Sequence, residues 1–206
     1  MKSKIWELLL ADIKNEYGVA GLMGNLQAES GLYPDRVQGD IPYSNYSKEY
    51  TTKVDSGEIS EYDFVHNGPN GGGYGLAQWT YPSRKQGLYD MKKSEGYSSI
   101  GSVELACQYL LYELRNTYLE VYATLKYATS IRQASDKVLH DFENPKEQGE
   151  SVEVLRCELG TTIYNELSGG DIPDTPDEPD IPDTPINLYK KKKHYKFHLF
   201  KKRRIL

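Results

Sequence analysis

"GLMGNLQAESGLYP", residues 21–34, reads as the last turns of a helix and the loop that follows. Gly31 and Pro34 are stop signals, because glycine adopts the left-handed conformation that ends helices and proline cannot continue one. The acid of this stretch, Glu29, stands in the last turn, where the partial negative charge of the helix end disfavours a carboxylate. Burial would act in the same direction, so we expect Glu29 to hold a proton near neutral pH.

A protonated carboxyl group at this place suits one kind of chemistry. General-acid cleavage of a glycosidic bond needs a carboxylic acid that is still protonated near neutral pH. Because most glutamates on helices are simply solvated, a solvated surface role remains the alternative for Glu29.

A second stretch, "GGGYGLAQWTYPSRKQGL" at residues 71–88, is rich in glycine. No GK[ST] follows the glycines and their spacing is not that of a dinucleotide-binding loop, which argues against a phosphate cradle. Glycines also let the main chain approach a ligand closely. Here Gln78 could bond the amide groups of sugars, and Tyr74 or Trp79 could stack on a sugar ring. Packing in the core is the alternative for Trp79.

Apolar residues recur with helical spacing over most of residues 1–168. We expect helices near the N-terminus and over about 19–30, 83–93, 102–116, 131–142 and 147–166. Residues 31–73 are polar and rich in tyrosine, which predicts a small β element or loops. The predicted fold class is therefore mainly α, of the α+β kind, with a single helical domain at residues 1–168.

The composition changes after this domain. Residues 169–185, "GGDIPDTPDEPDIPDTP", have proline at every third position and predict an extended linker. Residues 186–206 form a tail with nine Lys/Arg and no acid, whereas the preceding 185 residues carry 16 basic against 30 acidic residues, a net charge of −14. Such asymmetry is typical of an attached segment with its own partner.

Aromatic and aliphatic residues alternate with two basic clusters in the tail. This pattern predicts adhesion to an anionic wall polymer or a membrane surface. A disordered, solubilising end is the alternative. Nucleic-acid binding fits the charge, but nothing else in the chain supports it, so we expect no specific nucleic acid.

The cysteines and histidines predict no further chemistry. Cys107 and Cys157 are too few for a disulfide framework and lie among apolar residues, which favours core packing. The four histidines lack metal-ligand spacing, so we expect neither a metal nor a cofactor. A Cys/His peptidase that uses either thiol with His140 is the alternative enzyme class, although apolar helix faces do not favour thiolates.

The motifs together carry a resemblance. A Glu-Ser-Gly at a helix end, followed by Gly-Leu-x-Gln, resembles the lysozyme-like superfamily, which includes goose-type lysozymes and lytic transglycosylases. Two later motifs, "FENP" at 142–145 and "QGESVEVLR" at 148–156, extend the match. With four motifs in family order over about residues 1–167, the chain is most similar to the phage tail lysozyme family.

The resemblance implies a lysozyme-like fold and a muramidase that cleaves between N-acetylmuramic acid and N-acetylglucosamine in bacterial peptidoglycan. We also expect a monomeric domain without cofactors. The matching catalytic position is Glu29. The residues expected to contact the glycan are Ser30, Tyr74, Gly75, Leu76, Gln78, Trp79 and Thr80. A lytic transglycosylase and a non-catalytic wall-binding or structural module of a phage particle remain alternatives.

The second carboxylate is an open point. Goose-type lysozymes carry an aspartate two residues beyond the motif glutamine, where this chain has Thr80. Of the acids in residues 31–73, Asp63 and Asp55 are the better candidates because they precede the glycine-rich stretch at residues 71–88, the glycine loop. Glu143 of the FENP motif is expected to be structural, pairing with an arginine or tying a loop.

The N-terminus, MKSKIWELLLADIKNE, has a short apolar run interrupted by acids and no small-residue cleavage site. We therefore expect synthesis in the host cytoplasm without a signal peptide. The resemblance then places the action at the bacterial cell wall, as part of a phage tail or as a lysis enzyme (endolysin).

Overall fold

The computed structural model describes residues 1–40, 42–68 and 72–169. The α-helices are α1 (Lys2–Ile13), α2 (Glu16–Ser30), α3 (Asn45–Ser56), α4 (Pro82–Ser94), α5 (Val103–Asn116), α6 (Leu119–Tyr127), α7 (Ile131–Val138) and α8 (Glu150–Leu167). Two single π-helical turns are η1 (Asp63–Asn67) and η3 (Leu139–Glu143). Apart from Gly169, the predicted linker and basic tail lie outside the described residues.

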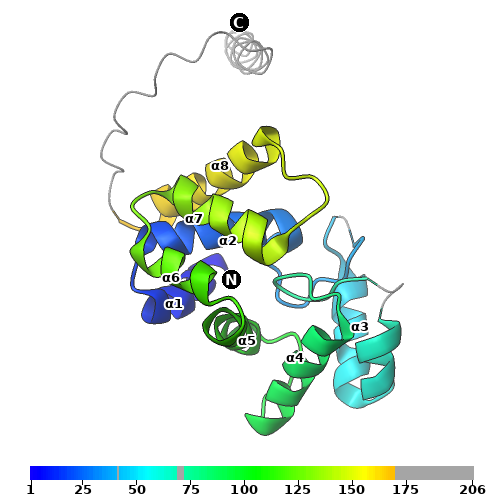
Figure 1. The fold of residues 1–206 in the computed structure, drawn as a ribbon. Helices are drawn as coiled ribbons and strands as arrows, with labels where there is room; N and C mark the ends of the chain where they lie inside the picture. Colours follow the sequence, from blue (N-terminus) through cyan, green and yellow to red (C-terminus); the bar gives the residue numbers. More distant parts are fainter. Residues whose placement is uncertain (41, 69–71, 170–206) are drawn as a thin grey trace, which may run out of the picture. The chain divides into compact units, whose positions relative to one another are not determined.

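The predicted fold class is confirmed: the domain is mainly helical (Figure 1). Within the described ranges no strand forms. The small β region consists of two isolated antiparallel bridges, one between Val37 and Tyr74 and one between Tyr74 and Trp79. None of the helices in these ranges is long and apolar enough to cross a membrane.

Helix α2 ends where the sequence predicts, but it begins at Glu16, three residues before the predicted start. The side chain of Asn15 accepts hydrogen bonds from the main-chain N–H groups of Tyr17 and Gly18, which satisfies donors that the first turn leaves free. Gly31 adopts the left-handed conformation at φ 67°, and its N–H donates to the carbonyl of Gln27. The predicted stop after Ser30 is therefore confirmed, and Glu29 lies in the last turn.

Helix α2 lies at the centre of the domain and contacts α1, α6, α7 and α8 (Figure 1). Three glycines spaced three residues apart make these contacts close. A Cβ atom on Gly18 would stand 1.9 Å from a main-chain oxygen of α6, and one on Gly21 would stand 2.6 Å from a side-chain carbon of α7. A Cβ on Gly24 would stand 2.3 Å from a main-chain oxygen of α8. Any side chain at these positions would push the helices apart.

Helix α3 lies in the stretch that the sequence predicted as β or loop. Its buried residues are Ser47, Tyr50, Thr51 and Val54, which have helical spacing but include a single aliphatic side chain. The hydroxyl of Ser47 accepts from the N–H of Val37, so this face is polar because it bonds to the neighbouring loop. The spacing of apolar residues in the sequence therefore did not indicate helix α3.

Two further differences concern the C-terminal half. The short helix α6 was not predicted. The helix expected over 131–142 is α7 followed by the turn η3, because the chain changes from α-helical to π-helical hydrogen bonding at Leu139. This change of pitch places Glu143 at the end of the turn.

We predict that Gly24→Ala lowers the free energy of unfolding by about 1–3 kcal/mol, as overpacking of a close core contact does. Denaturant unfolding at equal m-value measures the difference. Gly149→Ser is the control, since a Cβ at Gly149 meets no atom within 4 Å and serine suits its place as the N-cap of α8. Equal stability of the two variants would contradict the role given to the α2–α8 contact.

Candidate active site

Glu29 is held by an arginine from the far end of the sequence. Nη2 of Arg156, on α8, donates to Oε1 of Glu29 at 2.5 Å. Nη1 of Arg156 donates to both the main-chain and the side-chain oxygen of Asn25, at 3.3 Å each. The Arg156 side chain is 8% exposed and that of Glu29 is 24% exposed. The acid therefore faces a buried cation on one side and is accessible to solvent on the other.

The end of α2 and the glycine loop are both bonded to Arg36. Its guanidinium donates to the carbonyl of Ser30 at 3.2 Å and to that of Asp40 at 2.7 Å. Its carbonyl accepts from the N–H of Gly75 at 2.8 Å and from Nε2 of Gln78 at 3.0 Å. The end of α2 and the glycine loop are therefore joined through one residue, and the structure brings together the stretches that the sequence singled out.

Most residues expected to contact the glycan lie below the surface. Tyr74 and Trp79 are 0% exposed, and Leu76, Gly75 and Ser30 are also buried. Neither aromatic ring presents a face on which a sugar could stack. The predicted stacking role of Tyr74 and Trp79 is not supported, because both rings pack inside the loop.

Gln78 and Thr80 are the accessible members of the expected set. Thr80 is exposed, and its hydroxyl donates to the carbonyl of Gln78 at 3.0 Å. Gln78 is half-buried at φ 46°, a conformation that is uncommon for residues other than glycine. Its amide nitrogen donates to two main-chain carbonyls, those of Arg36 and Gly75. The glutamine thus holds the loop in shape from within.

The two candidates for a second carboxylate have other partners. Asp55 accepts from the N–H of Ile100 at 2.8 Å and pairs with Lys92 at 3.1 Å. Asp63 accepts from the hydroxyl of Ser60 and from the amide of Asn67, and these bonds lower its pKa. The described contacts connect neither aspartate to Glu29 or Arg156, so the structure does not bring these acids together with Glu29.

A second buried ion pair lies behind the glycine loop. Arg84, on α4, donates to both carboxylate oxygens of Glu113, on α5, at 2.6 and 2.8 Å. The indole N–H of Trp79 donates to the same carboxylate at 2.7 Å. Burial acts to lower the pKa of Arg84, but the bonds to Glu113 more than compensate and the pKa is raised. Trp79 is therefore a polar anchor of the loop as well as a core residue.

Glu143 differs from the expectation that it pairs with an arginine. The residue is half-buried as a whole, but its Oε1 is inaccessible and has no hydrogen-bond partner. Burial, with a further contribution from the charge of Glu29, raises the pKa of Glu143 to about 8. The surroundings of Glu143 therefore disfavour its ionised form.

The described residues do not favour thiol or metal chemistry. Burial raises the pKa of Cys107 to about 12 and also raises that of Cys157. His140 bonds to Gln148 and Glu153 and to neither thiol. In the part of the chain that the structure describes, no three His, Cys, Asp or Glu side chains are grouped as metal ligands would be.

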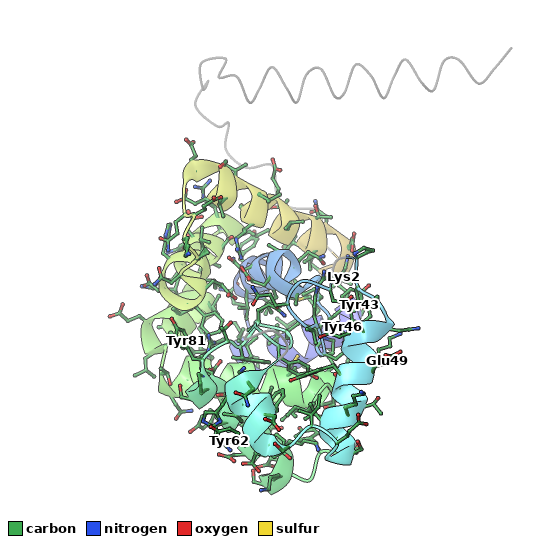
Figure 2. All side chains as sticks on the ribbon, turned by 90° about the vertical axis from the view of Figure 1, so that its right-hand side faces the viewer. Lys2, Tyr43, Tyr46, Glu49, Tyr62 and Tyr81 are labelled. Carbon is green, nitrogen blue, oxygen red and sulfur yellow. The ribbon has the colours of Figure 1, made fainter. Side chains whose placement is uncertain are left out.

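Exposed tyrosines offer aromatic surface on the elements that precede and follow the glycine loop in the sequence. Tyr46, Tyr62 and Tyr81 are among the large exposed side chains, and Figure 2 shows where they project from α3, the start of η1 and the start of α4. Tyr33 stacks on Tyr43 with ring centroids 3.8 Å apart, four residues after Glu29. A shallow hollow elsewhere is lined by Tyr17 and its neighbours at the opposite end of α2, so it is no part of this site.

Comparison with known proteins assigns the chain to a family. The family model described as Phage tail lysozyme matches residues 1–167. The chain belongs to the phage tail lysozyme family. A search of curated proteins finds no match. Family membership indicates a lysozyme-like glycoside hydrolase with peptidoglycan as its substrate, and it fits a phage-associated protein that acts on the cell wall.

The sequence alone did not point to several residues of this site. Arg156 lies within the motif at 148–156, which assigns it no role, and no sequence pattern points to Arg36, Arg84 or Glu113. An arginine that pairs across more than 100 positions leaves no local pattern in the chain. The family's late motif around Arg156 was the one available signal.

We predict that Glu113→Ala lowers the free energy of unfolding by about 3–5 kcal/mol, because it leaves the Arg84 guanidinium and the Trp79 N–H without their buried acceptor. Chemical denaturation measures this effect. Glu104→Ala on the same helix is the control, since its ion pair with Lys4 spans 3.8 Å at the surface and is expected to contribute less than about 1 kcal/mol. A small effect at Glu113 would exclude its role as the anchor of the loop.

Proposed function

We propose that the chain is a muramidase that hydrolyses the bond between N-acetylmuramic acid and N-acetylglucosamine in peptidoglycan, with Glu29 as the general acid. The observation that carries the proposal is the placement of Glu29 within a chain of this family. It is a partly accessible carboxyl group at the end of the central helix, fixed by a buried arginine and joined to the glycine loop through Arg36.

In the proposed reaction the proton of the Glu29 carboxyl group passes to the glycosidic oxygen. The bond from this oxygen to C1 of the muramyl sugar breaks, and its electron pair stays on the oxygen. A water molecule then adds to C1 and releases a proton. The proton transfer leaves Glu29 as a carboxylate. The Arg156 guanidinium stabilises the carboxylate form through the ion pair that the structure shows.

Two other functions are compatible with the same family. In a lytic transglycosylase the 6-hydroxyl of the muramyl sugar takes the place of water, and the product is a 1,6-anhydro sugar. In a wall-binding or structural module of the phage particle, Glu29 would have no catalytic role. Asp55 and Asp63 stay without a role in this proposal because each is held by other partners.

We expect Glu29→Gln to reduce the rate of peptidoglycan hydrolysis by about 10²–10⁴-fold, the contribution of positioned proton transfer. Zymography and turbidity loss of purified peptidoglycan measure the rate. Glu7→Gln is the control, since Glu7 is exposed on α1 and its replacement makes the same change in net charge. A Glu29→Gln variant that folds and keeps full activity would remove Glu29 from the mechanism.

The products decide between the two reactions. Mass spectrometry of wild-type digests is expected to show reducing muramyl ends. A predominance of 1,6-anhydro ends would assign the chain as a lytic transglycosylase, and binding to peptidoglycan without any cleavage would favour the structural module.

A further inference from the structure

The main chain reverses direction directly after the turn of α2 that carries Glu29. Gly31 and Leu32 both have the left-handed conformation, at φ 67° and 64°. The N–H of Tyr33 donates to the carbonyl of Ser30 at 3.3 Å, and two residues of positive φ within such a bond are typical of a type I′ turn. Because leucine disfavours this conformation, the turn is strained at Leu32. The turn holds Tyr33 beside the end of α2.

The Tyr33 ring itself lies against the end of this helix. A Cβ atom on Gly31, the residue that caps α2, would stand 3.3 and 3.4 Å from two ring carbons of Tyr33. Nη1 of Arg36 would stand 3.1 Å from the same point, and it donates to the carbonyl of Ser30. The Tyr33 ring and the guanidinium of Arg36 are therefore close to each other, next to the residue that follows Glu29.

Tyr33 and Tyr43 form a parallel sandwich. Their ring centroids are 3.8 Å apart and their planes differ by 3°. Aromatic pairs prefer offset or edge-to-face arrangements with centroids about 4.5–7 Å apart, because the negative faces of two rings repel each other. The stack is therefore held in place by its surroundings and not by ring–ring attraction alone.

Polar contacts fix Tyr43, which lies just before α3 (Figure 2). Its hydroxyl donates to the carboxylate of Asp35, 2.8 and 2.7 Å from the two oxygens. Burial and this bond raise the pKa of Tyr43, so the hydroxyl keeps its proton and stays a donor. Nζ of Lys48 lies over the Tyr43 ring, 5.7 Å from its centroid. Tyr43 is therefore a support, and its own contacts are already made.

Tyr33 is the member of the stack that keeps accessible surface. It is 36% exposed, whereas Tyr43 is half-buried. Since Tyr43 covers one face of the Tyr33 ring, the accessible part of this ring lies on its other face and its rim. The Tyr33 hydroxyl has no partner among the described residues. Tyr33 thus offers apolar ring surface together with a free polar tip, the combination that suits a sugar with its C–H faces and hydroxyl groups.

We propose that the Tyr33–Tyr43 stack is an aromatic subsite for one N-acetylated amino-sugar ring of the glycan strand, beside the proposed general acid Glu29. Tyr33 contacts the sugar, and Tyr43 supports Tyr33 from behind. The inference rests on the proposed function, because it names residues that hold the substrate of that site. It takes over the stacking role for which the buried rings of Tyr74 and Trp79 have no accessible face.

The strained turn and the polar contacts have a function in this proposal. A ring that is fixed before the sugar arrives loses little conformational freedom on binding, so more of the contact energy appears as affinity. The turn fixes Tyr33 from the main chain, and Asp35 fixes Tyr43 from its hydroxyl.

Binding of a sugar that cannot be cleaved tests the subsite on the full chain. The probe is a tetrasaccharide of N-acetylglucosamine in which sulfur replaces the glycosidic oxygens, and calorimetry measures its Kd. We expect Tyr33→Ala to raise the Kd about tenfold, the effect of one lost aromatic contact. Denaturant unfolding of each variant verifies that the fold is kept.

The matched control is Tyr127→Ala. Tyr127 ends α6 and is 77% exposed, and α6 packs on the start of α2, since a Cβ on Gly18 would meet Leu125. The same loss of an exposed tyrosine at the opposite end of α2 is expected to leave the Kd in place.

A conservative variant separates the ring from its hydroxyl. Tyr33→Phe keeps the stack and is expected to restore most of the affinity that Tyr33→Ala loses. In peptidoglycan hydrolysis we expect Tyr33→Ala to raise KM and to change kcat little, because the sugar contact is made equally in the ground state and the transition state.

The outcomes separate this inference from the proposed function, because the binding experiment does not depend on cleavage. Absence of binding to the wild type, an unchanged Kd in Tyr33→Ala, an equal loss in Tyr33→Phe, or an equal loss in Tyr127→Ala each overturns the subsite, while Glu29 stays the general acid. Full activity of Glu29→Gln overturns the proposed function, and the Kd values still decide whether the stack binds sugar.

Discussion

The structure depends on how closely the main chain of α2 lies against its neighbours. Gly18, Gly21 and Gly24 carry no side chain at the points where α2 comes closest to α6, α7 and α8. From the other side, a Cβ on Gly160 of α8 would stand 2.6 Å from a main-chain oxygen of α2, so the contact is close in both helices. Interiors packed to this density have few alternative arrangements, which fixes the distance between the two helices.

That distance determines the site. Arg156 and Gly160 lie one turn apart on α8, and Glu29 lies at the end of α2 beyond Gly24. The guanidinium therefore reaches Asn25 and Glu29 because the helix that carries it is held against α2. A half-buried ion pair of this kind adds little to stability by itself, because desolvation offsets the attraction between the charges. Its value lies in the orientation that it gives to the acid.

The glycine loop contributes shape more than contact surface. Tyr74 and Trp79 pair across the loop as a β-bridge and both point inward, where Thr51 and Glu113 bind their polar tips. The backbone strain at Gln78 is stored in the same loop, and strained residues of this kind are common where a site needs a defined form. The accessible aromatic surface comes instead from tyrosines on α3, before η1 and at the start of α4.

The sequence by itself determined the helical class, the end of α2 at Gly31 and the two motifs that the site combines. These features are local: caps, glycine stops and apolar periodicity act within a few residues. The sequence did not predict α3, because the buried face of this helix is polar and bonds to the loop before it. It also did not decide whether Tyr74 and Trp79 lie in the core or on the surface. The tertiary structure alone decided the partners of the charges. It paired Glu29 with Arg156 and raised the pKa of Glu143, because burial and neighbouring charge depend on which helices meet and not on the order of residues.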